Sequence, residues 1–530
     1  MTAKSIDPIR LKAALRDGGE LAILDVREDG QFPLGHLLYA VPAPYSRFEA
    51  VVGRLIPRRS TRVVLVDAGD GVADKAARSL GRLGYDDVAV LTGGTPAWAA
   101  AGFVLFEGVN VPSKAFGELV EHECGTPSIA AEELKEWLDR GDELIVLDSR
   151  TFEEFQAHSL PTGMSCPGAE LVYRVHDLVR SPDTTVVVNC AGRTRSIIGA
   201  QSLINAGLPN RVVAFRNGTM GWRLAGHAPE QGKSARAPAP SPAGLAKAKL
   251  AANGVARRFA VPRVDQVTLA AWQSDGVRTT YLFDVRDPEE FITGHLPESV
   301  SAPGGQLVQA TDKWIATLGA RVVLVDDTEV RATMTAHWLM QMGWDAHVLA
   351  GGLADQRLVT GKDVAPLAIE DAVEVMAPGD LRRALHAGRT CVVDVGSSHA
   401  FRAGHIAGAI WAPRAQLEGA IAKLPRGHAI VVTADDDTLS ELAARDIEGL
   451  TASPVAMLAG GTSGWKRAGL PVETTPHVPA EADCIDHWFW EHERRRFVPQ
   501  RMQEYLDWEI ALPAQITADG DARFRVVVPR

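Results

Sequence analysis

The sequence predicts an α/β protein built from four tandem copies of one domain, followed by a C-terminal tail. Three observations lead to this prediction. A short apolar run ending in a polar turn occurs four times, a second apolar run follows each at a nearly constant distance, and a glycine-rich corner closes each copy. Repetition of a whole supersecondary unit indicates related domains. The 530 residues also exceed what one hydrophobic core supports, since domains usually hold about 100–150 residues.

The first apolar run of each copy has the composition of a buried parallel strand. The four runs read LAILDVRE, LIVLDSRTFEEF, YLFDVRDPEEF and CVVDVGSSHAF, and each contains an aspartate at the strand end: Asp25, Asp148, Asp284 and Asp394. A histidine follows ten or eleven residues later in every copy: His36, His158, His295 and His405. Because the histidine recurs in all four copies, we expect it to belong to the core rather than to act as a general base.

The second apolar run follows the first aspartate at nearly the same distance in every copy, and it ends at Asp67, Cys190, Asp326 and Ala434. A helical segment and a glycine corner follow, written LTGGTPAW, FRNGTMGW, LAGGLADQ and LAGGTSGW. Strands that alternate with helices predict a mainly parallel sheet with helices on both faces.

The domain boundaries follow from this register. The predicted units cover 1–109, 110–230, 258–366 and 370–476. Residues 231–257 include GKSARAPAPSPAGLAKAK, whose Pro, Ala and Ser content predicts a linker. The tail, 477–530, is rich in aromatic residues. We expect it to pack on one of the domains or on a second subunit, so a homodimer stays open.

Composition excludes several classes of partner. A net charge of -11 and a pI near 5.8 argue against nucleic acid, and no apolar run is long enough to span a membrane. The first residues lack the apolar core of a secretory signal. Five irregularly spaced cysteines without a CxxC pair predict a reduced, cytoplasmic protein that needs no metal or other cofactor.

The second unit differs from the others in its loop, in the stretch VVVNCAGRTRS. Cys190 ends the strand, and Ala191, Gly192, Arg193, Thr194 and Arg195 lead into the helical run SIIGAQSLINAG. Loop amides, a helix N-terminus and two arginines all favour an anion. We therefore expect Cys190 to be a nucleophile with a pKa below the ordinary value of about 8.5, and the five loop residues to bind the substrate.

The corresponding loops of the other units read DAGDGV, DDTEVR and ADDDTL. None has a sulfur nucleophile, and all carry carboxylates, which would repel an anionic substrate. We expect these units to be inactive. Solvated acidic turns are the simplest interpretation of the carboxylates, with metal binding as the alternative.

The DxR strand end, the GHxP segment, the strand–Cys–loop–helix and the glycine corner before Trp together resemble the rhodanese (sulfurtransferase) superfamily. The resemblance covers about four fifths of the chain, as four rhodanese-like domains of which the second is catalytic. It implies that the Cys190 thiolate takes a sulfane sulfur from thiosulfate, releases sulfite, and passes the sulfur to cyanide or a thiol. Arg193 and Arg195 would bind the sulfonate.

Other functions stay open. Cysteine phosphatases and arsenate reductases, some built on the same fold, place an arginine six positions after the cysteine, whereas this chain has Ser196 there and Arg195 one position earlier. Mercaptopyruvate is a further donor, although it suits two arginines less well. A persulfide carrier or scaffold that passes sulfur to a partner protein is the alternative from another class.

Several residues near Cys190 remain secondary candidates. Asp148 and Arg150 recur in inactive units, which favours a structural ion pair, although a supporting role beside Cys190 stays open. Cys166 is either a resolving partner in a reversible disulfide or a packed core residue. In the tail, Cys484, His487 and His492 have a loose metal-like spacing without an evident fourth ligand.

Overall fold

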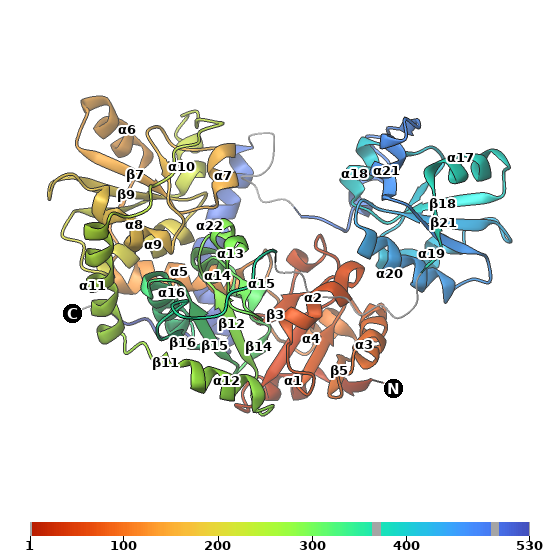
Figure 1. Ribbon diagram of the computed structural model, residues 1–530, viewed down its shortest axis with the longest axis horizontal. Coiled ribbons are helices and arrows are strands. Elements are labelled where there is room, and N and C mark those ends of the chain that lie inside the picture. The colour runs from red at the N-terminus through yellow and green to blue at the C-terminus, as the bar shows by residue number, and fades with distance from the viewer. Residues whose placement is uncertain (1–2, 363–372, 489–497, 529–530) are drawn as a thin grey trace.

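A computed structural model describes residues 3–362, 373–488 and 498–528, and it confirms four repeated α/β units (Figure 1). Each unit has a parallel sheet with helices on both faces. The first unit contains β1 (Lys4–Ile6), α1 (Pro8–Ala14), β2 (Leu21–Asp25), β3 (Ala40–Pro42), α2 (Phe48–Leu55), β4 (Val63–Val66), α3 (Val72–Arg82), β5 (Val88–Leu91) and α4 (Gly94–Ala100). Helix α5 (Val111–Cys124) connects it to the second unit.

The second and third units repeat this order of elements. The second contains β6 (Ser128–Ile129), α6 (Ala131–Arg140), β7 (Leu144–Asp148), α7 (Phe152–Ala157), β8 (Met164–Ser165), α8 (Glu170–Arg174), β9 (Thr185–Asn189), α9 (Thr194–Asn205), β10 (Val212–Phe215) and α10 (Gly218–Leu224). The third contains β11 (Arg263–Val264), α12 (Gln266–Ser274), β12 (Thr280–Asp284), α13 (Pro288–Thr293), β13 (Val300–Ser301), α14 (Gly304–Gln309), α15 (Thr311–Trp314), β14 (Thr317–Leu318), β15 (Arg321–Val325), α16 (Val330–Gln341) and β16 (Asp345–Leu349).

The fourth unit lies apart from the other three in Figure 1. It contains β17 (Val375–Met376), α17 (Pro378–His386), β18 (Thr390–Asp394), α18 (Ser398–Ala403), β19 (His405–Ile406), β20 (Ile410–Trp411), α19 (Leu417–Ile421), β21 (Ala429–Thr433), α20 (Asp437–Glu448), β22 (Val455–Leu458), α21 (Gly461–Arg467) and β23 (Val472–Glu473). It contacts the first unit through Arg414, whose buried guanidinium donates to Glu49 and to Asp446.

The central strands have the same order in all four sheets. This order determines which loops lie together at the carboxyl ends of the strands. The second sheet runs β6-β10-β9-β7-β8, and its neighbours pair in parallel. Strands β9, β7 and β10 are rich in apolar residues because both faces of the sheet are covered. The loops that follow their carboxyl ends therefore meet at one edge, where ligands of open α/β sheets bind.

One strand crosses between units. Strand β14 of the third unit pairs antiparallel with β2 of the first, with Thr317 opposite Ala22 and Leu318 opposite Leu21. The first sheet therefore gains a strand from a distant part of the sequence, an addition that the repeat pattern does not reveal.

The predicted linker, 231–257, differs from expectation because it contains most of a long helix, α11 (Pro242–Arg258). Ser241 caps the helix by accepting a hydrogen bond from the amide of Gly244. Ala248, Ala252 and Val255 are buried in a core shared by the second and third units. Small apolar residues at helical spacing thus allow this segment to pack between the second and third units, despite its prolines.

The tail forms helix α22 (Pro499–Asp519), which packs along α5 and touches α10. Beyond it, the chain contacts the first and third units: Lys12 donates to Asp521 over 2.6 Å, and the Arg525 amide donates to the carbonyl of Gln341. The tail therefore packs on domains of its own chain.

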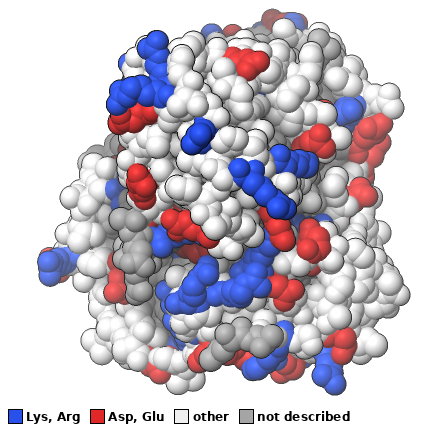
Figure 2. Space-filling view, turned by 90° about the vertical axis from the view of Figure 1, so that its right-hand side faces the viewer, with Lys and Arg blue, Asp and Glu red and all other residues white. Residues whose placement is uncertain are grey.

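On the face shown in Figure 2, acidic and basic side chains are interspersed, and Lys and Arg gather in one hollow in the lower half. Among the described residues, no helix is both long and apolar enough to cross a membrane.

Candidate active site

Cys190 lies directly after β9, at the carboxyl edge of the second sheet, and 1 % of it is exposed. The loop that follows enters α9 at Thr194. The glycine corner holds this loop from the other side: the amide of Thr219 donates to the Cys190 carbonyl over 2.9 Å, and the amide of Met220 donates to that of Ala191 over 3.1 Å. The repeated corner therefore fixes the backbone of the cysteine loop.

The glycine corner approaches the backbone of the cysteine loop closely, and this explains why the corner carries glycine. Gly218 has a φ of +53°, and a Cβ there would clash with the Cys190 carbonyl oxygen. The same clash recurs in the other units, where a Cβ on the equivalent glycine would meet the carbonyl of the strand-end residue; those glycines are Gly94, Gly352 and Gly461. The corner is therefore a structural feature of the repeat that also shapes the site.

Replacing Gly218 by alanine is expected to destabilise the second unit by more than the cost of positive φ alone, which is about 1–2 kcal/mol. The added clash should displace the Cys190 carbonyl and slow alkylation of the thiol. Gly226→Ala is the matched control, because Gly226 has a φ of +84° and its Cβ would touch nothing within 4 Å. Equal unfolding midpoints and equal Cys190 alkylation rates for the two variants would contradict the role assigned to the corner.

Both loop arginines are paired with carboxylates. Contrary to expectation, neither presents an unbalanced positive charge to the thiol of Cys190. Arg193 donates to both carboxylate oxygens of Glu118, over 2.7 and 2.8 Å, and also pairs with Glu121. Arg195 makes a bidentate pair with Glu154, with both distances 2.7 Å. Carboxylates on neighbouring helices therefore balance both charges.

The expected lowering of the Cys190 pKa does not occur in this arrangement. Burial raises the pKa of the thiol, and the positive charge of Arg195 and hydrogen bonds from Ser196 oppose that rise without overcoming it. The expectation of a strongly activated thiolate is therefore corrected to a buried thiol whose main cationic support is Arg195.

Asp148 and Arg150 form the expected ion pair at the strand end. Arg150 donates to both oxygens of Asp148, over 2.8 and 2.7 Å, and to the His158 carbonyl. Asp148 also accepts a 2.7 Å hydrogen bond from the side chain of Asn189, the residue before Cys190. The pairs Asp25–Arg27 and Asp284–Arg286 repeat this geometry in units without a cysteine, so the pair holds strand ends together in three of the units.

The strand-end aspartates in the loops of the first and third units are not solvated. Asp67 and Asp326 are 3 % and 1 % exposed, and each turns its carboxylate onto its own loop. Asp67 accepts from the amides of Gly69, Gly71 and Ala73, and Asp326 accepts from those of Thr328, Glu329 and Arg331. The expectation of exposed carboxylates is therefore wrong for Asp67 and Asp326, whereas Asp70 and Asp327 in the same loops are exposed. In both units, the loop binds an anion that belongs to the protein.

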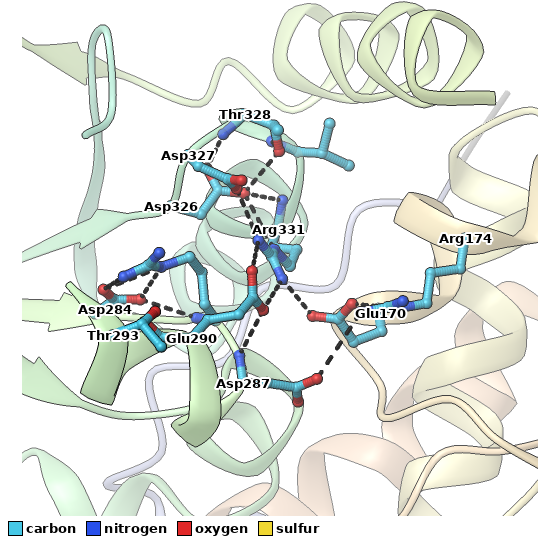
Figure 3. Close-up of polar contacts among 12 residues, drawn as sticks. Glu170, Arg174, Asp284, Asp287, Glu290, Thr293, Asp326, Asp327, Thr328 and Arg331 are labelled. Carbon is cyan, nitrogen blue, oxygen red and sulfur yellow. Dashed lines mark hydrogen bonds and ion pairs between the residues drawn. The ribbon is translucent and has the colours of Figure 1, made fainter. Parts of the chain in front are cut away.

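Figure 3 shows the ion pairs and hydrogen bonds around the loop of the third unit, where Arg331 lies among several carboxylates. Arg331, five positions after Asp326, matches Arg195, and it pairs with Glu290 as Arg195 pairs with Glu154. Arg331 also donates to Glu170 of the second unit over 2.8 Å. Glu170, Asp287 and Glu290 have oxygens close enough for a metal ion, but Arg331 bonds two of these three carboxylates. The cluster therefore works as a buried ion-pair junction between units.

The remaining cysteines and histidines lie away from the loop. Cys166 is fully buried, burial raises the pKa of its thiol, and it forms no disulfide with the other four cysteines, all of which are described. His36, His295 and His405 are buried and stack on phenylalanines, whereas His158 of the second unit is only half-buried, so the expected core position holds for three of the four histidines. Of the tail candidates, Cys484 donates to the carbonyl of Ala480, His487 contacts Ser398, and His492 lies outside the described residues.

A cavity of about 540 Å³ lies beside Cys190, and sequence reasoning missed most of its wall. The cysteine loop forms one side of it. The other sides come from α5, from the third unit and from the tail helix, through Lys114, Gln306, Gln309, Lys313, Trp314, Tyr505 and Glu509. The aromatic character of the tail indicated packing, but nothing local in the sequence indicated that it reaches the site.

The glutamate in this wall contacts the loop directly. Glu509 is 1 % exposed and accepts hydrogen bonds from the amide and the hydroxyl of Thr194. The ammonium group of Lys114 lies 3.6 Å from the same carboxylate and over the ring of Tyr505. The site is therefore a composite of the second unit, the third unit and the tail.

Comparison with known proteins agrees with the repeat. The model of the rhodanese-like domain matches residues 7–101, 130–225, 266–356 and 377–468. The chain belongs to the rhodanese-like family. Each match includes the central strands and the loop of one unit, so the family assignment covers all four units and not only the one with the cysteine.

Among solved structures, this rhodanese-like protein is similar to a thiosulfate sulfurtransferase from Pseudomonas aeruginosa, with 46% sequence identity and a TM-score of 0.94. The match covers 99% of this chain and 100% of that one. The Alr3790 protein from Anabaena sp. matches at 25% identity and a TM-score of 0.18, over 19% of this chain and 82% of that one. No curated protein matches the chain.

Proposed function

We propose that the protein is a thiosulfate sulfurtransferase that works through a persulfide on Cys190. The observation that carries this proposal is the contrast between loops. In the first and third units a buried carboxylate accepts the loop amides, and in the second unit a cysteine follows the same strand. A loop that binds carboxylate oxygens in two copies suits the anionic sulfur of a persulfide in a third. The similarity to a thiosulfate sulfurtransferase supports the same reaction.

The reaction has two steps. The Cys190 thiolate attacks the outer sulfur of thiosulfate, the S–S bond of thiosulfate breaks, and sulfite leaves with the bonding electron pair. Cys190 then carries a persulfide anion. Cyanide or a thiolate attacks the outer sulfur of that persulfide, forms thiocyanate or a new persulfide, and returns the Cys190 thiolate. No external oxidant or reductant is needed, because each step exchanges one nucleophile for another at sulfur.

The decisive assay measures thiocyanate released by the full-length protein from thiosulfate and cyanide. Steady release above the rate without protein is expected. A parallel assay with an aryl phosphate addresses the phosphatase alternative, for which the five-position spacing from Cys190 to Arg195 is unfavourable. Phosphate release without thiocyanate release would overturn the proposal.

Arg195 is expected to be the cation that supports catalysis. Arg195→Met should lower kcat/KM for thiosulfate by about 10²–10³, the usual cost of losing one charge-stabilising donor. Since Arg195 opposes the rise in the Cys190 pKa, its loss should raise that pKa further, so that alkylation by iodoacetamide requires a higher pH.

Glu154→Gln is the matched variant for this prediction, because it leaves Arg195 in place without its counter-charge. The pH at half-maximal alkylation should then move down. A shift in the same direction for both variants would show that Arg195 does not act on the thiol through its charge.

A further inference from the structure

The carboxylate of Glu509 lies on the part of the loop that receives an anion in the first unit. Its Oε1 accepts from the backbone amide of Thr194 over 3.3 Å, at the first residue of α9. Thr194 stands four positions after Cys190. In the first unit, the amide four positions after Asp67 is that of Gly71, and it donates to the Asp67 carboxylate over 3.0 Å. The same loop amide therefore binds a carboxylate in both units.

The other oxygen of Glu509 faces the middle of the loop. A Cβ added to Gly192 would lie 3.4 Å from Oε2 of Glu509 and 3.3 Å from the ring of Tyr505. The tail helix therefore places the negative charge of Glu509 and the ring of Tyr505 against the loop between Cys190 and α9.

The three cations closest to the loop each lie beside a carboxylate, and the further cation of the cavity wall, Lys313, is an exposed residue of the third unit. Arg193 is paired with Glu118 and Glu121, and Arg195 is paired with Glu154. Lys114 is 2 % exposed, and its ammonium lies 3.6 Å from Glu509. A doubly charged donor that approaches Cys190 therefore meets balanced ion pairs and a carboxylate already on the loop.

We propose that Glu509 is a specificity-determining residue of the Cys190 site, which disfavours negatively charged sulfur compounds relative to neutral ones, and doubly charged compounds most of all. Glu509 does this by occupying part of the anion position of the loop. The tail thus sets the charge preference of a site whose nucleophile belongs to a different and distant part of the sequence. As a statement about turnover, this inference rests on the proposed sulfurtransferase function. The effect of Glu509 on the reactivity of Cys190 can, however, be measured without turnover.

The test compares alkylation of Cys190 by anionic iodoacetate and by neutral iodoacetamide in the full chain, followed by mass spectrometry of the Cys190 peptide. The ratio of the two rates removes any change in thiol pKa, because both reagents need the thiolate. In Glu509→Gln, the iodoacetate-to-iodoacetamide ratio should rise on the order of fivefold, since one negative charge close to the thiol is lost. Glu504→Gln is the control, because Glu504 is exposed on the same helix, where it accepts a hydrogen bond from Gln500.

Steady-state kinetics give a second readout. Glu509→Gln should lower the KM for thiosulfate severalfold and change kcat less than KM. Thermal unfolding of each variant checks folding, and Glu509→Asp supplies a milder change that keeps the charge opposite Lys114 and should give an intermediate ratio.

The outcomes separate this inference from the proposed function. An unchanged or lower alkylation ratio in a folded Glu509→Gln protein would overturn the inference, whether or not the enzyme turns over. Absence of thiocyanate release by the unaltered protein, together with a raised ratio in the variant, would overturn the proposed function and leave the inference standing.

Discussion

Cys190→Ala protein is expected to release no thiocyanate above the rate without protein. The three other strand-end positions hold Asp67, Asp326 and Ala434, none of which can carry a sulfane sulfur. A persulfide route therefore has one starting point, and its removal should eliminate the reaction rather than reduce it. The measurement is steady-state thiocyanate formation with thiosulfate and cyanide.

Cys166→Ala is the matched control, because Cys166 belongs to the same unit and is fully buried. Its thiol is not part of the cavity wall beside Cys190, so turnover should persist. Loss of turnover in a folded Cys166→Ala protein would instead favour a resolving role for that cysteine. Residual turnover in Cys190→Ala would show that another group carries the sulfur.

Arg331→Met is expected to destabilise the second and third units by about 3–5 kcal/mol, the usual cost of removing one partner from a buried charge network. The Arg331 side chain is fully buried, and it donates to Glu170, Glu290 and Asp327 over 2.7–3.1 Å. Without it, Glu170 and Glu290 face one another across the interface. Urea unfolding, followed through the transition of these two units, measures the change.

Arg236→Met is the control for this prediction. Arg236 lies in the segment that follows the second unit, and it pairs with Glu289 of the third unit at 3.4 Å. Both side chains are exposed. Exposed pairs contribute about 0–1 kcal/mol, so this variant should unfold almost like the unaltered protein. Equal destabilisation by the two variants would contradict the burial argument.

The repeat was predictable from the sequence because its signals are local. Strand-end aspartates, buried valine-rich runs and glycine corners recur at nearly constant spacing, and each constrains the backbone within a few residues. Gly218 illustrates this: only glycine allows the corner to pack against the Cys190 carbonyl, so the fold requires it wherever the corner is formed. The unusual loop at Cys190 was visible for the same reason, as a departure from a repeated pattern.

The surroundings of Cys190 were not predictable because they come from distant segments. Glu509 and Tyr505 lie on a helix outside the repeat, and Lys114 lies on a connecting helix, so no spacing relates them to the loop. The pairing of Arg193 with Glu118 similarly needs the packing of α5 on α9. The buried carboxylates in the loops of the first and third units were misjudged because a loop's own amides can satisfy an acidic side chain without solvent.

The most direct test of the central claim, that the second unit's loop carries the transferred sulfur, is peptide mass spectrometry after incubation with thiosulfate alone. A gain of about 32 Da, one sulfur atom, is expected on the Cys190 peptide and on no other cysteine peptide, and added cyanide should remove it. An unmodified Cys190 peptide, or the same gain on the peptide of Cys124, Cys166, Cys391 or Cys484, would contradict it.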